Sequence, residues 1–125
     1  MHKKSVVTLL VLLACQLLWA QSSALTGFPK NFTPQEVGKR LAYHFIDDRH
    51  DLYAAKYIHY AEVCTWNGAL DYAVKAKDQK LIQLLKDKFE PFFDREKPLL
   101  PPMNHVDYNM FGSLALKLYQ LTKDE

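Results

Sequence analysis

The chain alternates between stretches with one apolar face and stretches that are apolar on nearly every side. Residues 34–48 and 79–90 carry apolar residues at three- and four-residue spacing, with charged residues between them. That spacing is typical of an amphipathic helix with one buried face. Residues 57–76 and 108–121 have few polar positions, which favours helices buried on most sides. We therefore predict an all-α fold with four helices in the order amphipathic, buried, amphipathic, buried.

Local signals mark where these helices begin and end. Thr33, Pro34 and Glu36 have the spacing of a capping box with proline at the first helical position. Asp78 is a favourable N-cap for the third helix. Gly68 interrupts the second helix at a cost of about 1 kcal/mol relative to alanine. We expect close approach of another backbone at this glycine.

The two buried stretches resemble each other. "WNGAL" at 66–70 returns as "MFGSL" at 110–114, and "AKDQ" at 76–79 returns as "TKDE" at 122–125. Self-similarity at this spacing is typical of stacked helical hairpins. Because "AKDQ" precedes a helix in the first copy, we expect residues 33–125 to be the truncated N-terminal part of a longer array. Only the first two hairpins would be present, after a lead-in over residues 21–32.

Alternating outer and inner helices can close into an (α/α) toroid, in which the inner helices line a central pocket at one end. His105 and Asp107 lie at the entrance of the last apolar stretch. We expect this pair to face a cavity rather than the core. The alternative is that Asp107 only caps the helix, as aspartate often does. One His-x-Asp pair supplies too few ligands for a closed metal site.

The N-terminus has the anatomy of an export signal. "MHKK" is basic, residues 5–19 are mostly apolar, and small residues follow. The apolar run is short for a membrane span of about 20 residues. We predict a signal peptide over 1–20 and an exported protein, periplasmic or extracellular, with no transmembrane span in the mature chain. In the alternative, a lipoprotein signal, Cys15 would carry the lipid anchor. If the signal peptide is removed, Cys64 is the one cysteine left, and we expect it to be a buried apolar residue.

The net charge and a few individual residues bear on the class of ligand that this protein binds. A net charge of +2 without a basic stripe gives no indication of a nucleic-acid partner. Tyr60 and Trp66 have the ring size of sugar-stacking platforms, although aromatic residues at helical spacing more often belong to a core. Glu62 stands on an apolar helix, where a lone carboxylate is costly. It therefore either pairs with a neighbour such as His59 or faces the pocket.

Three segments resemble glycoside hydrolase families 88 and 105, the unsaturated glucuronyl and rhamnogalacturonyl hydrolases. They are "YAEVCTWNGALDYA" (60–73), "FEPFF" (89–93) and "LLPPMNHVDYNMFGSLALKLY" (99–119). The most specific part is "HVDY" followed by "FG", and the match is closer to family 105. The resemblance implies a toroid of six helical hairpins. It also implies hydration of the C4=C5 double bond of an unsaturated uronyl residue at an oligosaccharide end, without a metal or cofactor.

The resemblance also implies roles for single residues. Asp107 matches the family's first pocket aspartate, which supports the main catalytic acid, and His105, Tyr60 and Trp66 become candidate substrate-binding residues. The main acid belongs to a later Trp-x-Asp-Asp-like segment, and these 125 residues contain none. We therefore expect the chain alone to be inactive. The alternative function is a non-catalytic helical-repeat protein that binds glycans or acts as a scaffold.

Overall fold

The computed structural model describes residues 26–102, 104 and 106–123, with only the backbone of Asp107 and Tyr108. The chain divides into two units, 1–33 and 34–125. In the first unit, residues 26–33 form an irregular segment with left-handed backbone at Gly27 and Asn31. The predicted signal peptide lies outside the described residues.

The second unit is mostly helical, and the four predicted helices are confirmed to within a few residues. Its elements in chain order are α2 (Pro34–Asp47), β1 (Leu52–Tyr53), β2 (Tyr57–Ile58), α3 (Tyr60–Ala76), α4 (Gln79–Phe89), the 3-10 turns η1 (Glu90–Phe93) and η2 (Lys97–Leu99), and α5 (Val106–Thr122).

The start of the second helix was predicted wrongly. Residues 57–58 belong to a short antiparallel hairpin, in which Leu52 lies opposite Ile58 and Tyr53 opposite Tyr57. The hairpin continues one step further, because the backbone N–H of His59 donates to the carbonyl of Asp51 at 2.8 Å. Ile58 is almost completely buried. Burial of this side chain and the ladder hydrogen bonds favour the extended backbone over another helical turn.

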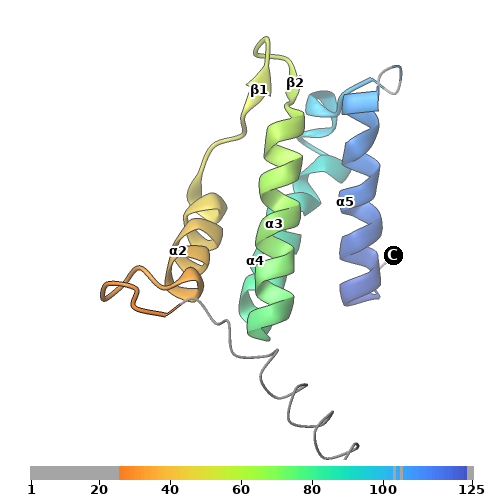
Figure 1. Ribbon diagram of the computed structural model, residues 1–125. Coiled ribbons are helices and arrows are strands. Elements are labelled where there is room, and N and C mark those ends of the chain that lie inside the picture. Colours follow the sequence, from red (N-terminus) through yellow and green to blue (C-terminus); the bar gives the residue numbers. More distant parts are fainter. Residues whose placement is uncertain (1–25, 103, 105, 124–125) are drawn as a thin grey trace, which may run out of the picture. The chain divides into compact units, whose positions relative to one another are not determined.

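Successive helices along the chain run antiparallel, and α3 packs against both α2 and α4 (Figure 1). Helix α3 lies in the middle and contacts α2, α4 and α5. Helices α3 and α5 run in the same direction, so both begin at the end of the unit that carries the hairpin (Figure 1).

The core is centred on α3, whose Trp66, Leu70 and Ala73 have no exposed surface. Helix α4 adds four buried residues, whereas the described side chains of α5 add only Leu114 and Leu118. The prediction that the fourth helix is more buried than the third is therefore wrong. Apolar residues lie on every side of α5, but only one side of this helix packs against the other described elements.

The sequence repeat is also a structural repeat. Helices α3 and α5 have 17 residues each. Leu70 and Leu114, which match in the two copies, are both completely buried. Both helices are followed by a lysine with left-handed backbone, Lys77 with φ 55° and Lys123 with φ 59°. The repeated "KD" therefore marks the same kind of helix end twice.

Asp78 caps α4 as predicted and also connects α4 to α2. Its Oδ1 accepts a hydrogen bond from the backbone N–H of Leu81 at 3.0 Å. Its Oδ2 accepts one from the hydroxyl of Tyr43, on α2, at 2.9 Å. The hydrogen bond from the neutral hydroxyl to this carboxylate raises the pKa of Tyr43.

The close helix contact lies at a different glycine from the one predicted. A Cβ at Gly68 would meet nothing within 4 Å, so the expectation of a close backbone there is wrong. A Cβ at Gly38, on α2, would lie 2.8 Å from Cδ2 of Tyr72, on α3. Gly38 is the residue that lets these two helices approach.

This difference predicts opposite effects of alanine at the two glycines. Gly38→Ala should lower the free energy of unfolding by about 1–3 kcal/mol relative to Gly68→Ala, because the ring of Tyr72 must shift. Gly68→Ala should gain up to about 1 kcal/mol from helix propensity. Urea denaturation of the two variants measures both changes. Equal midpoints for the two variants would contradict the close contact.

Candidate functional site

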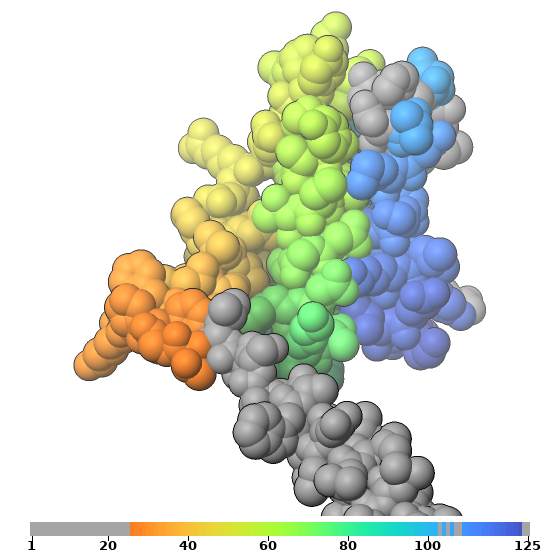
Figure 2. All heavy atoms as spheres, viewed as in Figure 1, coloured from red at the N-terminus to blue at the C-terminus, as the bar shows by residue number. Residues whose placement is uncertain are grey.

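The candidate site is the end of the unit at which α3 and α5 begin. The hairpin projects at this end, above the first turns of α3 (Figure 2). Tyr60 is the first residue of α3, and Asp107 is the second residue of α5. The fold therefore places two of the predicted site residues in the first turns of neighbouring parallel helices. His105 and the side chain of Asp107 lie outside the described part of the chain.

Asp107 lies within the first turn of α5, which begins at Val106. A carboxylate is favoured there by the helix dipole. The alternative role of Asp107 as a helix cap depends on its side chain and stays a prediction.

Trp66 is a core residue, and its predicted role as a sugar platform is wrong. Its side chain has no exposed surface, and its Nε1–H donates to the backbone carbonyl of Leu85 at 3.2 Å. The indole packs edge-on against Phe45 and Phe89, with ring centroids 5.3 and 5.8 Å away. Tyr60, in contrast, is 45% exposed and keeps a ring surface that a ligand can reach.

A buried polar network lies directly below the hairpin. Nδ1 of His50 lies 2.5 Å from Oε1 of Glu62, and its Nε2 lies 3.2 Å from Oε2 of Glu96. The other oxygen of Glu62 accepts the backbone N–H of Asp51 at 2.6 Å. One imidazole thus joins the segment after α2, the first turn of α3 and the turn between η1 and η2.

The geometry favours the cationic form of His50. A carboxylate only accepts hydrogen bonds, so both ring nitrogens must be protonated to donate to their two partners. The hydrogen bond to Glu62 raises the pKa of His50 most strongly. The charge of Glu62 and the bond to Glu96 act in the same direction, whereas burial and Lys88 act against it. The ring also stacks on Trp66, 6.4 Å away at 18°.

Glu62 has the partner that its place on an apolar helix requires, but this partner is not the predicted His59. The side chain of Glu62 is only 2% exposed and pairs with His50. His59 instead lies 3.4 Å from the carboxylate of Asp51. Glu62 therefore does not need to face a pocket.

The network lies next to an aromatic row formed by the exposed Tyr53 and Tyr60 and the partly buried His59. The rings of Tyr53 and His59 are stacked, 5.9 Å apart at 14°. The ring of His59 also contacts Tyr60, with centroids 4.5 Å apart. Tyr53 is 54% exposed. The carboxylate of Asp51 lies beside this aromatic row.

Cysteine and metal chemistry depend on Cys64 and on how the possible metal ligands are grouped. Cys64 is exposed, so the prediction that it is a buried apolar residue is wrong. It lies on the side of α3 that no described element covers. Within the described ranges, no three His, Cys, Asp or Glu residues are grouped as metal ligands would be.

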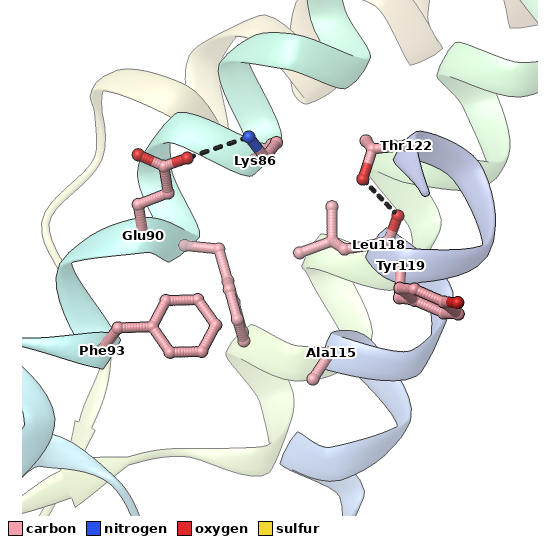
Figure 3. A pocket seen from close by; sticks show the side chains of 8 residues that line it. Lys86, Glu90, Phe93, Ala115, Leu118, Tyr119 and Thr122 are labelled. Carbon is pink, nitrogen blue, oxygen red and sulfur yellow. Dashed lines mark hydrogen bonds and ion pairs between the residues drawn. The ribbon is translucent and has the colours of Figure 1, made fainter. Parts of the chain in front are cut away.

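A separate groove of about 510 Å³ lies between α4 with η1 and the C-terminal half of α5 (Figure 3). Its walls are mostly apolar, with the Lys86–Glu90 ion pair, at 3.0 Å, on one side. The lining residues are Lys86, Phe89, Glu90, Phe93, Ala115, Leu118, Tyr119 and Thr122. Of the predicted site residues whose side chains are described, Tyr60 and Trp66, neither lines this groove.

Comparisons with protein-family models, curated proteins and solved structures gave no match. Among the helices that the structure describes, none is long and apolar enough to cross a membrane.

The charge of His50 predicts a pH dependence of stability. A histidine whose folded pKa is raised stabilises the fold fully below its unfolded value of 6.5. This contribution is lost as pH rises through the raised folded pKa. The free energy of unfolding, measured in urea between pH 6 and about pH 9, should therefore fall over this range.

The matched control is His44, which lies on α2 with a 73% exposed side chain. His50→Gln should flatten the pH profile, whereas His44→Gln should leave its slope unchanged. A wild-type stability that does not change with pH would show that His50 is not held as a cation.

Proposed function

We propose that this chain forms part of the pocket of an exported glycoside hydrolase. Its substrate would be an oligosaccharide with an unsaturated uronyl residue at the non-reducing end, as left by polysaccharide lyases. The observation that carries the proposal is the parallel arrangement of α3 and α5, with Tyr60 and Asp107 in their first turns at one end. A pocket lined by inner helices requires this arrangement, and the "HVDY" and "FG" segments support the reaction type.

In the proposed reaction, a carboxylic acid donates a proton to C4 of the vinyl ether, and water adds at C5. The same carboxylate accepts the proton that the water loses, so the acid is regenerated. The product is a hemiketal, which opens and releases the rest of the oligosaccharide. Asp107 would accept hydrogen bonds from sugar hydroxyls and influence the pKa of the main acid. His105 would donate from the pocket wall, and Tyr60 would contact the sugar ring.

The proposed architecture is a toroid of helical hairpins, of which this chain supplies the first two. The repeat of α3 in α5, including the buried leucine and the left-handed lysine after each helix, supports this architecture. The exposed apolar residues Leu116 and Tyr119 on α5 are also where a further inner helix would pack.

The test uses the longest protein that the coding sequence gives. An aspartate-bearing inner helix of the Trp-x-Asp-Asp type beyond residue 125, with loss of the double bond's ultraviolet absorbance from an unsaturated disaccharide, would support the hydrolase. Only plain helical hairpins, with no change in absorbance, would refute it and favour a scaffolding or glycan-binding protein.

A further inference from the structure

We infer that His50, Glu62 and Glu96 form a proton-operated latch. While His50 is a cation, it ties the turn between η1 and η2 to the first turn of α3, and loss of one proton releases that turn. The inference does not rest on the proposed function. It rests on three titratable side chains that come from three separate segments and meet at one buried imidazole.

The latch is balanced only while the imidazole carries two protons. Nδ1 of His50 lies 2.5 Å from Oε1 of Glu62, and Nε2 lies 3.2 Å from Oε2 of Glu96. A neutral imidazole has a single N–H, so it can donate to only one of these carboxylates. Its other nitrogen then presents a lone pair to a negatively charged oxygen. One of the two carboxylates therefore loses its place when the proton leaves.

The other groups around the imidazole favour loss of the proton. The rings of Phe92, on η1, and Trp66, on α3, lie 5.0 and 6.4 Å from it. The hydrogen bond to Glu62 raises the pKa of His50 most strongly, whereas burial and the positive charge of Lys88, on α4, act against it. The protonated state is therefore opposed from α4 and by the apolar rings, and it depends on both carboxylates.

Burial decides which carboxylate is released. The side chain of Glu62 is 2% exposed, and its second oxygen accepts the backbone N–H of Asp51 at 2.6 Å. Glu96 is 26% exposed, and Arg95 lies 3.5 Å from its other oxygen. An unpaired carboxylate is costly in the core but not in water. Nδ1 therefore keeps its proton and its bond to Glu62, whereas Nε2 loses its proton and Glu96 turns to water.

The turn that Glu96 belongs to is built from local hydrogen bonds. The backbone N–H of Glu96 donates to the carbonyl of Pro91 at 2.9 Å, and that of Leu99 donates to the carbonyl of Glu96 at 2.8 Å. Leu99 and Leu100 are only partly buried against the core. Segments of this kind open at a lower cost than core helices. The latch thus couples the proton on His50 to the order of the connection that leads into α5.

Nitrogen and proton NMR of the imidazole, recorded on the full chain between pH 6 and about pH 9, tests the order of release. Nε2 of His50 should lose its proton as pH rises, while Nδ1 keeps the proton that it donates to Glu62. Loss of the Nδ1 proton first would refute the latch. So would an imidazole that stays doubly protonated at the upper limit.

Amide hydrogen exchange follows the turn itself. After correction for its intrinsic pH dependence, exchange at Leu99 and Leu100 should accelerate roughly tenfold between the two pH limits, the scale of one hydrogen bond to a charged group. Low urea should not accelerate it further, because a local opening exposes little surface. Exchange at Leu70, in the middle of α3, should accelerate with urea. Equal urea dependence at Leu70 and Leu99 would show that the whole unit opens, and would refute the latch.

Glu96→Gln separates the latch from a general loss of stability, because an amide can accept from the charged imidazole and donate to the neutral one. Exchange at Leu99 should therefore lose its pH dependence in this variant. Glu96→Ala offers the imidazole no partner, so its turn should exchange fast already at the lower pH limit. Glu90→Gln is the matched control, because this carboxylate is 54% exposed, lies on η1 and pairs with Lys86. It should keep the wild-type profile, and a Glu96→Gln variant that also keeps it would contradict the latch.

Discussion

His50→Ala should lower the free energy of unfolding by about 3–5 kcal/mol, the scale for breaking a buried ion pair by removing one partner. Most of this loss of stability comes from the carboxylate that remains after the substitution. Glu62, only 2% exposed, would stay buried without the cation that neutralises it. The total free energy of unfolding of a native domain is only about 5–15 kcal/mol. We therefore expect the melting temperature to fall by more than about 10 °C.

Two further variants separate the charge from the packing. In the double variant His50→Leu with Glu62→Met, apolar side chains replace the pair, so no charge stays buried and the loss should be much smaller than for His50→Ala. His44→Ala removes only an exposed histidine next to Asp48 and should change the melting temperature little. Thermal melts followed by circular dichroism compare all three. A single His50→Ala variant as stable as His44→Ala would contradict the buried ion pair.

The helices could be predicted because their signals are local. Apolar spacing, the Asp78 cap and the left-handed residue after α3 all act within a few residues of each other. The hairpin could not be predicted in this way. Tyr57 and Ile58 also fit a helical pattern, and only pairing with Leu52 and Tyr53 makes them strands. Such pairing depends on contacts between segments, which a periodic pattern does not record.

The same limit explains the errors at Cys64 and on α5. A stretch that is apolar on every side indicates a buried helix, but it does not tell which side its neighbours cover. In this structure α2, α4 and α5 leave one side of α3 open, and Cys64 lies there. On α5, Leu116 is exposed and Tyr119 lines the open groove beside α4. Their apolar character was read correctly, but the pattern alone does not give their burial.

The sequence predicted one member of the buried network but not its partners. A lone glutamate on an apolar helix requires a partner, and Glu62 was recognised for this reason. The partner could not be found from spacing, because His50 precedes the hairpin and Glu96 lies in a turn beyond α4. Only the fold brings these three together. The nearest histidine in sequence, His59, lies in the aromatic row instead.

Asp107→Asn should lower turnover by on the order of 100-fold in an active enzyme that contains this chain, the scale of acid–base groups. Asparagine has nearly the same shape, but it lacks the charge that would act on the pKa of the main acid. It also presents donors where the carboxylate only accepts from sugar hydroxyls.

Stability separates this role from a structural one. Asp107 is in the first turn of α5, so losing its charge should cost about 0.3–1 kcal/mol through the helix dipole. The melting temperature should therefore change by only a few degrees while turnover collapses. Asp71→Asn is the control, because it removes an exposed carboxylate of α3 that pairs with Lys117 of α5. It should keep full turnover in the ultraviolet assay. If Asp107→Asn also keeps it, Asp107 serves only the helix, and the pocket assignment is wrong.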